Sequence, residues 1–411
     1  MVGSTTTDAQ TDSARRGSVG LTALWLALPL LGKPLAVISL LIFPVIRDRN
    51  GAGMPLLWGY FLLSCVYGAY ICIRALAAGA GATEPILDTL TVVLIPGLVY
   101  WVVRTPVRLN LKILFQLVVI SLVLVLLATL VERYIFDVRR PELLLGNPFN
   151  LAPLLFLPLF IATMDTLAPS RIWVWLGLIA ATMTLFVLGG LVQTRGLFIG
   201  AVLLWILRAV FMLTEPPDVR TRLWAACRML LPLFLAGALV FANGEVFSRY
   251  KAAANIILTQ DSTKEWSTDL RYRMIEAGIR AGKERPYFGY GPQHRFDAAL
   301  PDPETFPKRF SHLHNDFVTH WVAGGVPAVV LLTALLMYPA IAGFTRSVGQ
   351  SRNQLAQARG FGVLTSCALL GTAAANNVFF TDISAYSTSL TIVWSLVFIE
   401  VLKGKESSDA S

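Results

Sequence analysis

Charged residues are scarce in this sequence. Asp, Glu, Lys and Arg make up 14% of its 411 residues, against roughly 25% in ordinary soluble domains, whereas 55% of the residues are hydrophobic. Apolar runs such as 111–131 and 171–190 are near the ~20 residues that a helix needs to cross a bilayer. The composition excludes an ordinary soluble globular protein and predicts an all-α integral membrane protein.

Cysteine is also rare. The four cysteines lie within or beside apolar runs and form no CxxC pair, which argues against a structural disulfide and against a cysteine metal site. The net charge of +9 does not indicate a nucleic-acid partner, because many of the Lys and Arg residues lie in short connections between apolar runs, where positive charge fixes membrane orientation. The sequence also has no basic soluble module with interleaved aromatic residues.

Counting two short apolar runs near the start, we expect about twelve transmembrane helices. No small-residue cleavage site follows the first run, so we expect its helix to be retained. The expected spans are 18–32, 34–47, 54–78, 85–104, 109–131, 150–168, 171–190, 194–214, 222–243, 313–343, 357–377 and 383–402.

The basic residues predict an orientation for these spans. With the N-terminus in the cytoplasm, nearly every cytoplasmic connection is basic, and among the opposite connections "ERYIFDVRRPE" is the exception. Both termini are therefore expected to be cytoplasmic. The predicted regions are a tail over 1–17, nine helices over 18–243, an outer loop over 244–312, three helices over 313–403 and a second tail over 404–411.

The outer loop is long enough to escape the positive-inside rule and is not a linker by composition. Its segment "TDLRYRMIEAGIRAGKE" predicts an amphipathic helix with a basic face, and the following "RPYFGYGP" predicts tight turns. The apolar positions of the helix are Leu270, Met274, Ala277, Ile279 and Ala281. We expect a small, partly helical cap on the outer face.

Histidine is as rare as cysteine, yet three of the four histidines, His312, His314 and His320, fall where the outer loop turns apolar. On the same side of the membrane, Arg195 begins the eighth span and Arg271 lies in a basic cluster of the loop. The other members of the cluster are Arg273, Arg280, Lys283 and Arg285. Residues from three distant parts of the chain are therefore expected at one membrane face.

Arginines with a histidine suit transfer from an anionic leaving group to a hydroxyl. Arginine forks bind phosphate oxygens and keep their charge, and a neutral histidine can take a proton from an attacking hydroxyl. Structural alternatives remain open: Arg195 as a helix-end anchor and the basic cluster as a contact with anionic lipid headgroups.

A zinc site and a transport function are two alternatives to this chemistry. A zinc site from His294, His312, His314 and Asp316 has a spacing unlike common zinc signatures, so we expect neither a metal nor a cofactor. A transporter or flippase would have internal repeats and ionisable residues near the bilayer midplane. No repeat is visible in the sequence, and the polar groups collect at the outer ends of the spans.

The segment around His314 resembles the superfamily of O-antigen ligases and polymerases, which are bacterial inner-membrane glycosyltransferases. The ligase pattern is His, then Asn, Ser or Gln, nine residues, Gly, two residues, and Gly, Thr or Tyr; here His314, Asn315 and Gly325 match, and Ala328 departs at the last position. "QTRG" around Arg195 and "RYRMIEAGIRAGKERPYFGYG" after Arg271 resemble two further blocks of the family. "GNPFN", with Asn150, resembles an Asn-rich outer segment.

The resemblance implies a fold similar to the membrane-embedded C-type (GT-C) glycosyltransferases. It also implies metal-independent, inverting transfer of a glycan from undecaprenyl diphosphate to a sugar hydroxyl of lipid A-core, at the periplasmic face of the inner membrane. His314 would be the general base, and Arg195 and Arg271 would bind the diphosphate. Supporting positions would be Asn315, Gly325, Arg273, Arg285, His312 and Asn150. O-antigen polymerase shares the donor and the leaving group, so it remains an alternative.

Overall fold

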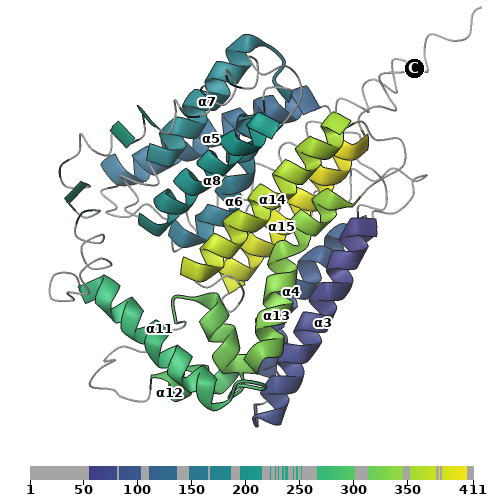
Figure 1. The fold of residues 1–411 in the computed structure, drawn as a ribbon, viewed down its shortest axis with the longest axis vertical. Coiled ribbons are helices and arrows are strands. Elements are labelled where there is room, and N and C mark those ends of the chain that lie inside the picture. The colour runs from purple at the N-terminus through teal and green to yellow at the C-terminus, as the bar shows by residue number, and fades with distance from the viewer. Residues whose placement is uncertain are drawn as a thin grey trace, which may run out of the picture.

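A computed structural model describes most of the chain. The described residues are 55–80, 83–102, 111–136, 148–164, 167–186, 195–214, 266–300, 313–345, 352–375, 379 and 382–404, with isolated positions between 223 and 251. Within these ranges the structure is helical and contains no strand (Figure 1). The helices are α3 (Pro55–Ala77), α4 (Thr83–Val102), α5 (Leu111–Tyr134), α6 (Pro148–Ala162), α7 (Arg171–Phe186), α8 (Arg195–Thr214), α11 (Trp266–Glu284), η6 (Pro292–His294), α12 (Arg295–Ala299), α13 (Asp316–Phe344), α14 (Arg352–Ala375) and α15 (Asp382–Gly404).

Four of the described helices are long and apolar enough to cross a membrane: Pro55–Ala77, Lys112–Tyr134, Asp316–Phe344 and Leu355–Ala375. The all-helical prediction is thus confirmed for the described residues, and the membrane character is supported. The first two expected spans and most of the ninth lie outside these residues, so the expectation of about twelve spans stays a prediction.

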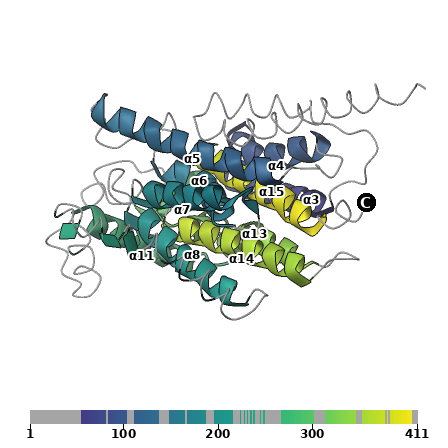
Figure 2. The same ribbon diagram turned by 90° about the horizontal axis from the view of Figure 1, so that it is seen from above.

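Helix α15 occupies the centre of the bundle. It packs against α3, α4, α6, α13 and α14, and Figure 2 shows it between α4 on one side and α13 on the other. Its side chains from Leu390 to Leu402 are almost all buried. The polar side chains of Thr391 and Ser395 donate to carbonyls of their own helix, so α15 can be buried on every side.

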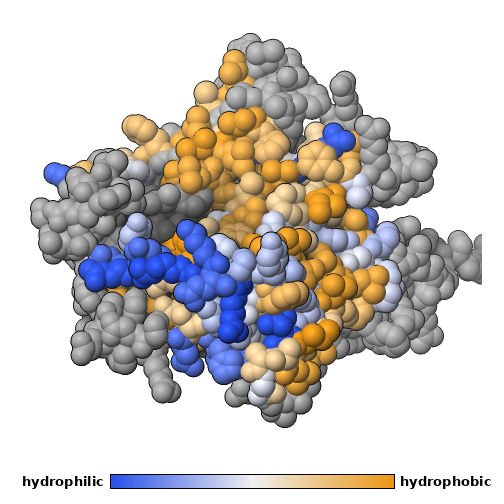
Figure 3. Space-filling view, turned by 60° about the horizontal axis from the view of Figure 1, so that its bottom comes forward, coloured by the Kyte–Doolittle hydropathy of each residue, from blue (hydrophilic) through white to orange (hydrophobic). Residues whose placement is uncertain are grey.

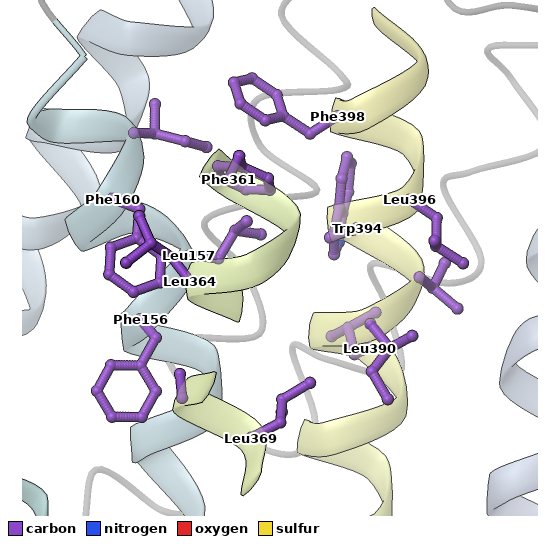
Figure 4. Close-up of a cluster of buried hydrophobic side chains, with 14 of the residues drawn as sticks. Phe156, Leu157, Phe160, Phe361, Leu364, Leu369, Leu390, Trp394, Leu396 and Phe398 are labelled. Atoms are coloured by element: carbon purple, nitrogen blue, oxygen red, sulfur yellow. The ribbon is translucent and has the colours of Figure 1, made fainter. Parts of the chain in front are cut away.

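Aromatic side chains fill the space between α6, α14 and α15 (Figure 4). The rings of Phe361 and Phe398 lie 4.7 Å apart between their centroids, and Phe156 stacks on Phe160 along α6. Because rings of this size bury much apolar area and prefer tilted or offset contacts, they fix the spacing of the three helices.

Small residues allow α13 and α14 to approach closely. A Cβ at Gly343 would lie 2.7 Å from the carbonyl oxygen of Ala358, and one at Gly362 would overlap the carbonyl of Pro339. Close approach through small residues is the usual way in which apolar helices pack when no water is present to drive their association. At this same end, the Lys403 ammonium donates to the Ala342 carbonyl and to Thr345 Oγ1, both at 2.7 Å, which satisfies acceptors at the end of α13.

Helix α13 is not the single continuous span that the hydropathy predicted over 313–343. Its backbone leaves the helical region at Gly325 (φ 72, ψ −167), so we divide it into a first half, 316–324, and a second half, 326–344. Figure 1 shows the two halves meeting at a sharp bend beside the end of α3. The hydropathy did not reveal the break because the residues on both sides of it are apolar.

Candidate functional site

The predicted amphipathic helix is confirmed as α11, Trp266–Glu284. It lies at the end of the bundle where α13 bends (Figure 1). Four of the five predicted apolar positions are buried, whereas Ile279 is half-buried. Leu270, Met274 and Ala281 form a small separate core with residues around the start of α13, namely Leu313, Val318 and Val322. Burial of this stripe holds α11 against the first half of α13.

Two glycines set the register between α11 and α13. A Cβ at Gly282 would lie 2.7 Å from the ring of Trp321, and one at Gly278 would lie 2.5 Å from Val318 and 2.8 Å from Leu313. Residue numbers rise in the same direction along the two helices, so α11 and the first half of α13 are parallel. The N-terminal part of α11 therefore lies toward His314.

The turn after α11 covers the break in α13. Tyr290 N donates to the Val322 carbonyl at 2.7 Å, Gly291 N to the Ala323 carbonyl at 2.9 Å, and Val326 N to the Pro286 carbonyl at 2.8 Å. A break in a helix leaves carbonyls and amides without their usual partners. Here the turn supplies those partners, which explains why a Pro and a Gly-x-Gly pattern precede the His segment.

Glycine is required at the break for two reasons. Gly325 has a left-handed backbone, and a Cβ there would overlap the backbone of Tyr287. Ala328, where the sequence departs from the family pattern, also lies in a crowded position. It is fully buried, and its methyl group would lie 2.7 Å from a Cβ at Gly324. A small residue therefore satisfies the last position of the pattern.

Contacts with α3 show how far the chain reverses at Gly325. The Tyr67 hydroxyl lies 2.8 Å from His320 Nε2, and the Tyr70 hydroxyl donates to the Gly324 carbonyl. Beyond the break, the ring of Tyr338 packs on that of Tyr60. The first half of α13 thus runs in the direction of α3 and the second half runs back. His314 consequently lies inward of the bend, not at the outer end of a straight span.

His314 and Asn315 form the start of the first half of α13. Among the described residues, His314 alone combines a side chain with a left-handed backbone (φ 55), a conformation that costs about 1 kcal/mol or more outside glycine. Asn315 follows as the N-cap: its Oδ1 accepts from Val318 N at 3.0 Å, and its Nδ2 donates to the Ala374 carbonyl at 3.1 Å. The cap and the buried Leu313 hold His314 from both sides.

Arg271 lies on the α11 face that packs on α13. It is half-buried and precedes Gly278 by about two helical turns, or ~10 Å along the axis. Since Gly278 approaches Leu313, Arg271 lies at the His314 end of the contact between the two helices. The structure brings these two predicted site residues to the same region.

The neighbouring arginines have other partners. Arg273 is ion-paired with Asp269 at 2.8 Å and is largely exposed, and Arg285 lies over the ring of Tyr290, 4.6 Å from its centroid. The hydrogen bond from Tyr290 to the Glu284 carboxylate raises the pKa of this phenol above its ordinary value of 10.0, so it remains a donor at neutral pH. Arg285 therefore belongs to the turn at the break, away from His314.

Arg195 is the first residue of α8. Near the other end of α8, Arg208 and Phe211 each have an atom 3.9 Å from where a Cβ of Gly360 would lie, in the first half of α14. The two helices pack together. Asn315 contacts the other end of α14, through the Ala374 carbonyl.

The remaining predicted positions contribute less. Asn150 lies in the first turn of α6, and His312 lies outside the described residues.

Figure 3 looks toward the α11 end of the molecule and shows hydrophilic residues in a band across the described surface, bordered by hydrophobic surface. No group of three or more His, Cys, Asp or Glu side chains within the described ranges could hold a metal ion.

Three buried polar residues next to this site have no part in the chemistry that the sequence predicted. Tyr67, Asp316 and His320 are at most 1% exposed, and they connect α3 with the first half of α13. One signal could have found Tyr67: in "YGAYICIR" the polar groups Tyr67, Tyr70 and Arg74 recur at helical spacing within an apolar span. His320 belongs to the predicted histidine cluster, but its position in the cluster predicts no contact with α3.

Replacing Asn315 tests the cap. Asn315→Ser keeps a side-chain oxygen for Val318 N but loses the donor to Ala374, whereas Asn315→Ala loses both. We expect stability to fall in the order Asn, Ser, Ala, with about 1–2 kcal/mol lost in the alanine variant. Thermal unfolding of the purified protein in detergent measures this order. An alanine variant as stable as the original protein would contradict the assigned cap.

The fold and the site define the class of protein: an all-helical membrane protein with a helical cap against a broken helix. A family model described as O-antigen ligase matches residues 178–333, a segment that includes Arg195, Arg271, His314 and Gly325 and spans less than half of the chain. The resemblance to the O-antigen ligase family is thus confirmed over this segment. A search of curated proteins found no match to the chain.

Proposed function

We propose that this protein is an O-antigen ligase of the bacterial inner membrane. It transfers a glycan from undecaprenyl diphosphate to a sugar hydroxyl of lipid A-core. In this proposal both termini are cytoplasmic, the segment 244–312 is periplasmic, and the reaction takes place at the periplasmic face.

One observation carries the proposal. His314, in a left-handed backbone fixed by the Asn315 cap, precedes the half-helix on which α11 packs, and Arg271 lies on the packed face of α11 toward His314. His314, Arg271 and Arg195 all fall inside the segment that matches the ligase family. A strained backbone held by its surroundings is frequent at functional sites.

The chemistry follows from the residue types. The guanidinium groups of Arg195 and Arg271 bind the diphosphate oxygens and stabilise the charge that develops as the diphosphate leaves. A neutral imidazole nitrogen of His314 takes the proton of the acceptor hydroxyl. The hydroxyl oxygen then bonds to the anomeric carbon as the bond from that carbon to the diphosphate oxygen breaks, which inverts the anomeric centre and releases undecaprenyl diphosphate.

The test is complementation of two deletion strains. The gene is expressed in a ligase-deleted and in a polymerase-deleted Gram-negative strain, each supplied with this protein's own O-antigen and core pathways, and lipopolysaccharide banding is compared at matched membrane levels. The ligase proposal expects long-chain ladders to return in the ligase-deleted strain. Restored chain length only in the polymerase-deleted strain would replace it with O-antigen polymerase, and no change in either strain would reject both.

A further inference from the structure

A chain of buried polar groups connects the first half of α13 to α3. The Tyr67 hydroxyl lies 2.8 Å from His320 Nε2. On the other side of the ring, His320 Nδ1 lies 2.8 Å from the Asp316 carbonyl oxygen and 3.2 Å from the carboxylate oxygen Oδ1. His320 and Asp316 are completely buried, and Tyr67 is 1% exposed.

The direction of these hydrogen bonds follows from the partners. A carbonyl oxygen can only accept a hydrogen bond. The Nδ1–H of His320 is therefore the donor, and the backbone carbonyl oxygen of Asp316 is the acceptor. The neutral ring then presents Nε2 as an acceptor for the Tyr67 hydroxyl, whereas a protonated ring would donate to the hydroxyl oxygen. The contact between α3 and α13 is therefore kept in either state of the imidazole.

These contacts restrict the position of His314. Asp316 is the first residue of α13 and His314 lies two positions before it, so a rotation of the first half of α13 would move His314 as well. Apolar packing is non-directional and tolerates such a rotation, whereas hydrogen bonds fix both distance and angle. The rings of Phe379 and Tyr67 lie 5.7 Å apart, so the phenol is also held by packing.

We propose that Tyr67 and His320 are positioning residues that, through Asp316, fix His314 in its orientation for proton transfer. The proposal rests on the proposed function, because it assigns the fixed geometry to the glycan transfer. Neither residue reaches the substrates. Their contribution is to kcat, because a small misplacement of a reacting group can lower a rate by up to about a hundredfold.

The kinetic test compares Tyr67→Phe with Tyr60→Phe in purified, reconstituted protein. Tyr60 is a matched control, because it is a fully buried tyrosine of α3 whose ring packs on the second half of α13. We expect Tyr67→Phe to lower kcat about tenfold or more with KM for both substrates within about twofold, and Tyr60→Phe to leave kcat within about twofold. Equal effects of the two variants would overturn the proposal.

A double variant tests whether the effect passes through the hydrogen bond. His320→Asn keeps a donor near the Nδ1 position and removes the acceptor for Tyr67. If Tyr67 acts through His320, Tyr67→Phe combined with His320→Asn should be no slower than the slower single variant. Multiplying effects would show that the two residues act independently and would overturn the assigned chain.

A labelling experiment separates this proposal from the proposed function. His314→Cys, in a background in which Cys65, Cys72, Cys227 and Cys367 are replaced by alanine, is reacted with a maleimide in membranes. Adding Tyr67→Phe should change the labelling rate by about threefold or more, and adding Tyr60→Phe should not. An unchanged rate would overturn the positioning role whatever reaction the protein catalyses, whereas failed complementation with a changed rate would reject only the ligase function.

Discussion

Glycan transfer should fall by about a hundredfold to ten-thousandfold when His314 is replaced by alanine. This is the range that a general base supplies. In cells, the variant should give no long-chain lipopolysaccharide ladder at a membrane level equal to that of the original protein. The reason is that the imidazole at this position is the group that we propose to accept the proton of the attacking hydroxyl.

His314→Asn makes the experiment sharper. Asparagine tolerates the left-handed backbone (φ 55) better than alanine does, so this variant preserves the local conformation and removes only the base. We expect it to unfold at the same temperature as the original protein and to be as inactive as His314→Ala. Substantial activity in the asparagine variant would reject His314 as the base.

The matched control is His294→Ala. His294 belongs to η6 at the same end of the molecule and is exposed, and its ring contacts the Ala78 carbonyl at 3.2 Å. Its replacement should leave activity within about threefold, because loss of one exposed hydrogen bond has a small effect on the fold. If His294→Ala lost as much activity as His314→Ala, the assignment of His314 as the only essential histidine among the two would be wrong.

Replacement of Gly325 by alanine should prevent the bend in α13. The added methyl group would overlap the Tyr287 backbone, and the residue would have to keep a left-handed backbone. Neighbouring backbone cannot move aside as a flexible side chain can. The turn would therefore lose its bonds to Val322, Ala323 and Val326, and we expect a loss of about 3 kcal/mol or more.

Gly371→Ala is the control for this variant. Gly371 lies within α14, and a Cβ there would meet no atom within 4 Å, so alanine should be neutral or should stabilise the helix by up to about 1 kcal/mol. Membrane level and thermal unfolding in detergent measure both variants. Gly325→Ala protein as abundant and as stable as Gly371→Ala protein would show that the bend is not required for folding.

The amphipathic helix was predictable because its signal is local. The apolar spacing over 268–284 predicted it, and α11 spans 266–284 with Leu270, Met274, Ala277 and Ala281 on its buried face. The glycine turns after it were predictable for the same reason: Gly289 and Gly291 both have a positive φ. Ile279 was predicted to be on the buried face, but it is half-buried because it lies at the edge of the apolar stripe.

The bend in α13 was not predictable from hydropathy. A window over 313–343 finds apolar residues throughout, and Gly325 with Pro327 is also compatible with a kink in a continuous span. The reversal is decided by two partners far away in the sequence, the turn 286–291 and Tyr70 of α3. For this reason the sequence alone placed His314 at the outer end of a straight helix.

The sequence by itself determined the class of protein, the residues of the proposed chemistry and the helices nearest to them. These depend on composition and on spacing within a few helical turns, which the chain carries locally. Only the tertiary structure decided that His314 precedes a folded-back half-helix, that Arg271 rather than Arg273 or Arg285 lies toward it, and that Tyr67 meets His320. The physical reason is that hydrogen bonds and close contacts between residues far apart in the chain form only when packing has fixed the helices side by side.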